Sequence, residues 1–272
     1  MLTKRAPNAT GKLLRSAAIA LLLAATVSGC ANSRMTTGSI DRQSGKPVEQ
    51  MSAQELQAAA QSLGAGYTRA PTDKAIGMRY AAVLQMNGST DQSLAVMRKL
   101  AIAHPQDRQV LAAYGKALAA AGQLEPALDA VRRAQTPEYP DWKLVSAEAA
   151  ILDQLGNSAE ARGLYRKALD MKPGEPTVLS NLGMSYVLEG DLRTAETHMR
   201  SAASAPGADS RVRQNLALVV GLQGRFEEAE KIARAELSPK QAQANVAYLR
   251  SMLAQQNAWT QLKDEEKKNA TN

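Results

Sequence analysis

A glycine recurs along the chain at a fixed spacing of 34 residues. It stands at Gly88, Gly122, Gly156, Gly190 and Gly224. A period of this length is typical of repeat proteins, in which each repeat is one supersecondary unit that buries its apolar side against its neighbours. With aromatic residues at only 4% of the chain, a large all-β domain is excluded. The sequence therefore predicts stacked helical repeats.

Other residue types recur in phase with the glycines. Small residues stand seven positions before and five positions after each one, and prolines recur at multiples of the same period. Small residues on both partners let two antiparallel helices approach closely, while the glycine provides a positive φ where the first helix ends. We expect the prolines to end second helices. The columns are Ala81, Gly115, Ala149, Gly183 and Ala217; Ser93, Ala127, Ala161, Ala195 and Ala229; and Pro71, Pro105 and Pro173.

The pattern resembles the tetratricopeptide repeat, most clearly in residues 224–229 (GRFEEA) and 181–186 (NLGMSY). The resemblance implies an all-α fold, a right-handed solenoid of antiparallel helix pairs with capping helices at both ends. The alternative, a generic alanine-rich bundle, predicts no fixed phase. Five repeats are expected in residues 74–243, with an N-terminal capping helix in 51–73 and C-terminal capping helices and a tail in 244–272. The expected repeat starts are Lys74, Arg108, Trp142, Pro176 and Ser210.

Residues 1–29 have the layout of an export signal. Four bases and no acid precede an apolar run, residues 16–27, which is shorter than the roughly 20 residues that a membrane-spanning helix needs. Removing this segment leaves 29 Lys and Arg against 26 Asp and Glu, so the formal net charge falls from +7 to +3. The apparent basicity belongs largely to the signal, and we expect no nucleic-acid partner.

Cys30 is the single cysteine and directly follows this segment. Residues 27–30 (VSGC) resemble the bacterial lipobox, with Val27 where leucine is usual, and the resemblance implies lipidation of Cys30 and anchoring to a membrane. The alternative is a small apolar residue within a helix. Ala31, by resemblance to the enterobacterial sorting rule, implies the outer membrane. The polar stretch in residues 30–50 is predicted to be a flexible tether.

The first helices are expected to carry the binding surface. Their residues at repeat positions 2, 5, 9 and 12 form a stripe apart from the packing columns, and in tetratricopeptide proteins this stripe lines a peptide-binding groove. Asn181 and Asn215 match an asparagine that bonds the ligand backbone in peptide-clamping members. The alternative for each candidate is a solvated polar side chain. The groove candidates are Lys116, Lys143, Ser180, Asn181, Met184, Arg211, Gln214 and Asn215.

Catalytic motifs are missing from the sequence. It contains no phosphate-binding glycine loop, no HExxH or GxSxG motif, and only two histidines, His104 and His198. We therefore expect a non-enzymatic protein with no catalytic residues, no cofactor, no metal and no small-molecule substrate.

The C-terminal sequence narrows the resemblance. Residues 210–230 (SRVRQNLALVVGLQGRFEEAE) and 236–253 (ELSPKQAQANVAYLRSML) look like the TadD family, repeat lipoproteins of the tight-adherence (Flp) pilus assembly system. The resemblance implies an outer-membrane scaffold on the periplasmic face, whose partners are the pilus secretin and other pilus components. The alternatives are an adaptor of another envelope machine and an activator of a periplasmic enzyme.

Overall fold

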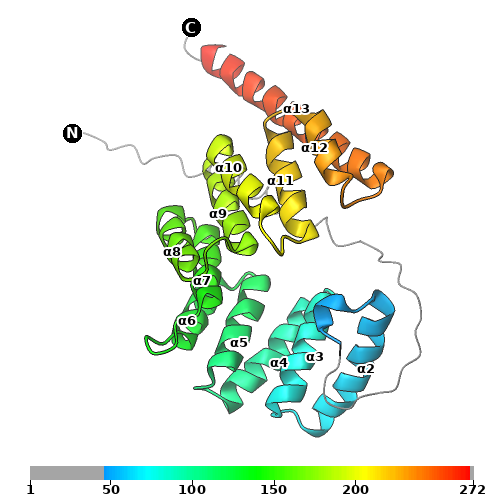
Figure 1. Ribbon diagram of the computed structural model, residues 1–272, viewed down its shortest axis with the longest axis vertical. Helices are drawn as coiled ribbons and strands as arrows, with labels where there is room; N and C mark the ends of the chain where they lie inside the picture. The colour runs from blue at the N-terminus through cyan, green and yellow to red at the C-terminus, as the bar shows by residue number, and fades with distance from the viewer. Residues whose placement is uncertain (1–45, 270–272) are drawn as a thin grey trace, which may run out of the picture. The chain divides into compact units, whose positions relative to one another are not determined.

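The computed structural model describes residues 46–269, with side chains through Gln256, and this part of the chain is helical with no strand (Figure 1). Its first helices α3, α5, α7, α9 and α11 begin at the five predicted repeat starts. The elements are η1 (Val48–Gln50), α2 (Ala53–Arg69), α3 (Lys74–Met86), α4 (Thr90–Ala103), α5 (Arg108–Ala120), α6 (Leu124–Ala134), α7 (Trp142–Gln154), α8 (Ser158–Met171), α9 (Pro176–Glu189), α10 (Leu192–Ser204), α11 (Ser210–Leu222), α12 (Phe226–Ala233) and α13 (Pro239–Asn269).

The chain divides into two compact units between Met171 and Lys172. The N-terminal unit contains η1 and α2–α8, and the C-terminal unit contains α9–α13. In each unit a first helix packs against the second helix that follows it, and neighbouring first helices also touch, α3 with α5, α5 with α7, and α9 with α11. This is the helix-pair arrangement that the 34-residue period predicts.

The helix boundaries follow from local chemistry. Four of the five first helices are preceded by an aspartate whose carboxylate accepts hydrogen bonds from backbone N–H groups of the first turn, for example Asp73 from Ile76 at 2.8 Å. Such caps satisfy donors that the helix leaves unpaired. The fifth, α9, has Glu175 without a side-chain cap and Pro176 in its first turn instead. In four of the five repeats, the start of the first helix is therefore set by an aspartate that belongs to none of the glycine, small-residue or proline columns.

The periodic glycines occupy the turns between first and second helices. All five have positive φ, from +74° at Gly122 to +90° at Gly190. An added Cβ at any of the five would meet no atom within 4 Å, so backbone conformation rather than crowding favours glycine there. The predicted turn geometry is confirmed.

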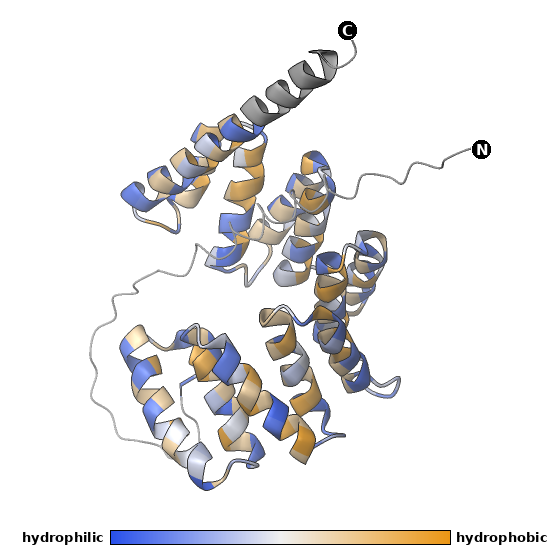
Figure 2. Ribbon diagram, turned by 180° about the vertical axis from the view of Figure 1, so that it is seen from behind, coloured by the Kyte–Doolittle hydropathy of each residue, from blue (hydrophilic) through white to orange (hydrophobic). Residues whose placement is uncertain are grey.

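The small-residue column lets paired helices approach closely. A Cβ added to Gly115 on α5 would lie 2.6 Å from a methyl of Val131 on α6. At the equivalent Gly183 on α9 it would lie 3.0 Å from two carbons of Met199 on α10. Both facing side chains are fully buried. Figure 2 shows that the helices carry both hydrophobic and hydrophilic residues, as packing on one side requires.

The N-terminal end differs from the predicted tether boundary. The sequence assigns residues 30–50 to a flexible tether, but Lys46–Gln50 pack against the folded body. Val48 is 8% exposed and clusters with Leu56 and Val83. The Lys46 ammonium pairs with Glu55 at 2.7 Å, and Arg79 donates to the Lys46 carbonyl at 3.1 Å. The folded body therefore includes the last residues of the predicted tether.

The C-terminal end also differs. The sequence predicts C-terminal capping helices and a tail in residues 244–272, whereas α13 is one helix that continues through Asn269. No glycine or proline follows Pro239, so nothing in the sequence ends the helix there. Through Gln256 it buries one stripe, Ala242, Val246 and Leu249, against the C-terminal unit.

Candidate functional site

The first helices of the N-terminal unit place their repeat positions 2, 5, 9 and 12 along one surface, which we call the N-terminal face. Five of its twelve residues are alanine, and two, Ser146 and Asp153, are buried. The predicted candidates Lys116 and Lys143 are both exposed. The N-terminal face comprises Ala75, Met78, Ala82 and Gln85 on α3, Gln109, Ala112, Lys116 and Ala119 on α5, and Lys143, Ser146, Ala150 and Asp153 on α7.

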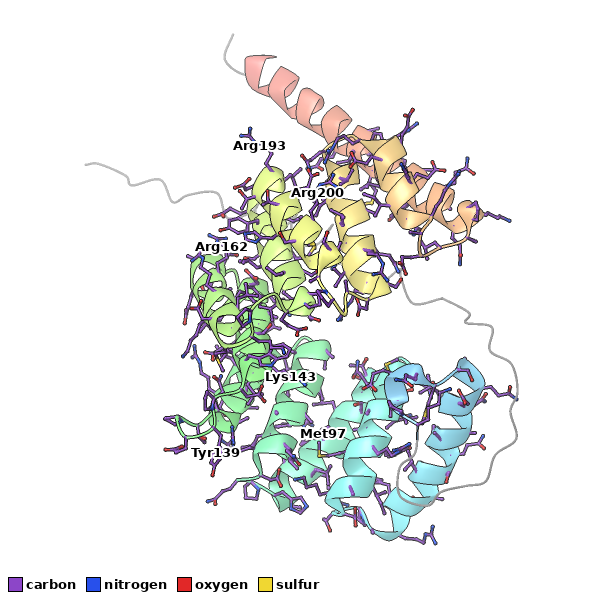
Figure 3. The ribbon with its side chains drawn as sticks, viewed as in Figure 1. Met97, Tyr139, Lys143, Arg162, Arg193 and Arg200 are labelled. Carbon is purple, nitrogen blue, oxygen red and sulfur yellow. The ribbon has the colours of Figure 1, made fainter. Side chains whose placement is uncertain are left out.

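Neither lysine on this face is engaged by an acid. In the described part of the chain, no carboxylate lies within ion-pair distance of the Lys116 or Lys143 ammonium. The Lys143 ammonium lies 5.5 Å from the centroid of the Trp142 ring. Figure 3 labels Lys143 near the start of α7. Both ammonium groups are therefore available to an anionic ligand.

On α9 and α11, the residues at repeat positions 2, 5, 9 and 12, together with Asn181 and Asn215 at position 6, form a second surface. We call it the C-terminal face. Here Ser180 is only 2% exposed, so its hydroxyl lies within the helix packing and not on an open surface. It donates to the Met199 sulfur at 3.5 Å and accepts from the Asn215 side-chain amide at 3.1 Å. The structure thus brings Ser180 and Asn215 together, but their side chains hydrogen-bond each other instead of facing a ligand.

Two further candidates on the C-terminal face also have intramolecular partners. Gln214 donates its amide to the Ser210 hydroxyl at 2.9 Å, and the Arg211 guanidinium lies 3.7 Å from the Asp209 carboxylate. The latter is an exposed, weak ion pair.

The remaining two candidates on this face are Asn181 and Met184. Both are half-buried. Within residues 46–256, no hydrogen bond engages the side chain of Asn181. Of the two matched asparagines, only Asn181 therefore has a side-chain amide that is available to a ligand backbone.

Ion pairs tie the second helices of the C-terminal unit together. Glu196 on α10 accepts from Arg225, Arg200 and Gln223, and Arg200 also reaches Glu228 on α12 at 2.5 Å. Figure 3 labels Arg200. The hydrogen bond from Arg225 is the main reason why the pKa of Glu196 falls to about 2. This network joins helices and offers no unpaired carboxylate at Glu196.

An open hollow of about 440 Å³ lies beside α12, a feature to which the sequence analysis assigned no role. The Arg250 guanidinium stands over the Phe226 ring, 4.7 Å from its centroid. Phe226 is the single phenylalanine of the chain, which is the one sequence signal for this hollow. Its lining residues are Gly224, Arg225, Phe226, Glu227, Glu228 and Arg250.

Both histidine side chains contact other residues of the protein. His104 hydrogen-bonds the Thr72 carbonyl at 2.8 Å, and His198 stacks on Tyr186 with ring centroids 5.5 Å apart. Among the described residues, no group of three His, Cys, Asp or Glu side chains could hold a metal ion, and no helix is long and apolar enough to cross a membrane. The signal segment and Cys30 lie outside the described residues.

Sequence comparison finds the tetratricopeptide repeat in one part of the chain. A tetratricopeptide-repeat family model matches residues 176–201, which span α9 and most of α10. No curated protein matches the sequence.

Solved structures with the same fold are numerous and distant in sequence. One chain of the Cut9–Hcn1 assembly of the APC/C is 14% identical with a TM-score of 0.57, over 74% of this chain and 40% of that one. PilW, described as a widely conserved type IV pilus biogenesis factor, is 17% identical with a TM-score of 0.57, over 74% of this chain and 91% of that one. A tetratricopeptide repeat protein from Parabacteroides merdae is 18% identical with a TM-score of 0.56, over 74% and 81%. Together with the helix pairs, the turn glycines and the family match, these likenesses show that the chain has the tetratricopeptide-repeat fold.

Proposed function

We propose that the protein is a non-enzymatic, lipid-anchored scaffold of the outer membrane that assists assembly of a tight-adherence pilus. The observation that carries the proposal is the sequence resemblance to the TadD family, which covers nearly the whole chain after the export signal and includes the lipobox-like residues 27–30. A repeat fold that presents rows of first helices supports a role in protein binding.

In this proposal Cys30 carries the lipid and the chain lies on the periplasmic face. Several acyl chains, each contributing about 0.8 kcal/mol per buried methylene, anchor a protein stably where one chain does not. The repeats bind the pilus secretin or another pilus component and assist its assembly or stability. The description of PilW as a pilus biogenesis factor agrees with such a role, although at 17% identity the likeness itself concerns the fold.

Deletion of the gene tests the pilus role. The expected result is loss of surface pili and fewer secretin multimers on immunoblots of unheated membrane samples, both restored by the wild-type gene. Unchanged secretin multimers would contradict the assignment to secretin assembly. Genes for pilin, secretin and secretion ATPase next to this one would favour the pilus over another envelope machine or a periplasmic enzyme.

A Cys30→Ser variant tests the anchor. We expect it to accumulate as an unlipidated precursor, lacking palmitate label and no longer fractionating with the outer membrane. Conversion of the exposed Ser62 on α2 to Ala provides a control that leaves Cys30 intact. If palmitate labelling and fractionation of the Cys30→Ser protein match the control, the anchor is elsewhere.

A further inference from the structure

The acids and bases of the first helices in the N-terminal unit are strongly unbalanced. Helices α3 and α5 contain no Asp or Glu, and the two acids of α7, Glu148 and Asp153, are only 9% and 8% exposed. Glu148 pairs with Arg132 at 2.7 Å, and Asp153 hydrogen-bonds the buried Tyr165 hydroxyl. None of these three first helices therefore presents an exposed carboxylate.

Five basic side chains lie on the same three helices, and three of them are held by groups of the protein. Lys116 and Lys143 are the remaining two, both exposed and both on the N-terminal face. The partners of the other three are Asp107 for Lys74, the Lys46 carbonyl for Arg79, and the Ala134 and Tyr139 carbonyls for Arg108.

Short side chains lie along the same stripe as these two lysines. Ala112 and Ala119 stand on either side of Lys116 along α5, and Ala150 follows Lys143 by two turns on α7. The Lys143 ammonium lies beside the Trp142 ring, and because α5 and α7 are in contact, the two lysines belong to neighbouring helices. Such a surface lets a partner backbone approach closely but offers no deep pocket for a large apolar side chain. Its chemistry favours a ligand recognised by charge.

The second-helix surfaces of the same unit do not share this character. Helix α6, for example, exposes Glu125 and Asp129 beside Arg132 and Arg133, and Asp129 lies 3.5 Å from Arg133. An acidic ligand meets exposed like charge there, whereas the one acid of the N-terminal face, Asp153, is buried. Charge complementarity thus distinguishes one surface of the unit from the others.

We propose that the N-terminal face binds an extended acidic segment of a partner protein, whose carboxylates pair with Lys116 and Lys143. The inference rests on the protein-binding role proposed above and names the chemistry of the partner. Because both lysines are exposed, the interaction weakens as salt screens the charges.

The test measures binding of a labelled peptide of repeated Glu-Gly-Ser triplets to the purified full chain by fluorescence anisotropy. A Gln-Gly-Ser peptide of equal length is the ligand control. The variant Lys116→Gln/Lys143→Gln is compared with Lys99→Gln/Lys167→Gln, which removes two exposed lysines from second helices of the same unit. Circular dichroism melting checks that both variants remain folded.

We expect the Glu peptide to bind more tightly than the Gln peptide, and its affinity to fall roughly twofold to thirtyfold in the face variant, as loss of two exposed ion pairs predicts. The second-helix variant should retain the affinity. Equal binding of the two peptides, or equal loss in the two variants, would overturn the inference. So would binding of a single-stranded oligonucleotide as tight as that of the Glu peptide.

These outcomes are separate from those of the pilus test. If the peptide results fail while gene deletion still removes secretin multimers, the scaffold role stands and the acidic ligand is wrong. If peptide binding shows the expected pattern while deletion leaves the multimers unchanged, the acidic-segment site stands and the pilus assignment fails.

Discussion

The two units differ in the state of the polar side chains on their first helices. On the N-terminal face, Lys116 and Lys143 stand among alanines with no carboxylate partner in the described part of the chain. On the C-terminal face, Ser180 and Asn215 are bonded to each other, and Gln214 is bonded within its own helix. The first helices thus hold available charge at repeat positions 2 and 9 in one unit, and internal hydrogen bonds at positions 5 and 6 in the other.

The packing columns show a similar contrast. Gly115 in the N-terminal unit faces Val131, whose branched side chain is stiff, while Gly183 in the C-terminal unit faces Met199, whose unbranched side chain adapts. The repeat position therefore determines where a side chain lies, whereas the neighbouring residues determine which contacts it makes and how freely it can move. Three substitution pairs test this view, from the largest expected effect to the smallest.

The glycine pair gives the largest difference. Gly115→Ala should destabilise the protein by about 1–3 kcal/mol, because the new methyl group lies 2.6 Å from a Val131 methyl that has little freedom to move. Gly183→Ala should cost about 1 kcal/mol less, because its nearest contact is longer, at 3.0 Å, and the flexible Met199 side chain can shift. The preference of the helix for alanine over glycine is the same at both positions. Urea denaturation followed by circular dichroism measures the free energies of unfolding.

Gly163→Ala is the control for this pair. Gly163 lies within α8, and its added methyl group would meet no atom within 4 Å, so this change should stabilise the protein by about 1 kcal/mol or less. Hydrogen exchange locates each effect, in α5 and α6 for the first variant and in α9 and α10 for the second. Equal destabilisation by Gly115→Ala and Gly183→Ala would refute the contrast between the facing side chains.

Much of the fold could be predicted because it depends on residues that recur. The five glycines with positive φ and the close approach at Gly115 and Gly183 both follow from the 34-residue period. The chain ends could not be predicted in this way. Lys46–Gln50 pack through single contacts such as Val48 with Leu56, and α13 continues through Asn269, where no repeat column applies.

The candidate site was less predictable than the fold. A repeat position predicts on which face of the helix a side chain lies. It does not predict whether a neighbouring residue forms a hydrogen bond with that side chain. Ser180 and Asn215 are 35 residues apart, one more than the period, so their bond joins position 5 of one repeat to position 6 of the next. For Lys116 and Lys143 no such partner exists among the described residues, and their role in binding a ligand stays a prediction.

Asn181 and Asn215 occupy the same repeat position, but only Asn215 donates a side-chain hydrogen bond to Ser180. They therefore test whether the hydrogen bond or the repeat position determines the contribution to stability. Asn215→Ala removes the amide that donates to Ser180 and should lower the free energy of unfolding by about 1 kcal/mol. Asn181→Ala removes a side chain without a hydrogen-bond partner among the described residues, and should change it by less than about 0.5 kcal/mol. A double-mutant cycle of Asn215→Ala with Ser180→Ala should show a coupling energy, and no coupling would mean that the bond contributes nothing.

The smallest expected effect concerns the acid sensitivity of one glutamate in each unit. Glu196 and Glu55 both have a pKa lowered to about 2, by the hydrogen bonds from Arg225 and Lys46 respectively. A lowered carboxyl pKa stabilises the folded state above the unfolded value of about 4.5, and this stabilisation is lost as the pH falls towards 2. The side chain of Glu196 is 14% exposed and that of Glu55 is 48% exposed, so solvent and salt screen Glu55 more strongly.

Urea unfolding of Glu196→Gln and Glu55→Gln between pH 7 and pH 2 measures this difference. The stability that Glu196→Gln loses relative to wild type should be greatest at neutral pH and should shrink as the pH falls from about 5 to about 2. Glu55→Gln should show the same direction with a smaller amplitude, which salt reduces further because its ion pair is exposed. A deficit for Glu196→Gln that stays constant across this range would show that the carboxylate charge does not join α10 to α12, and that geometry alone holds these helices together.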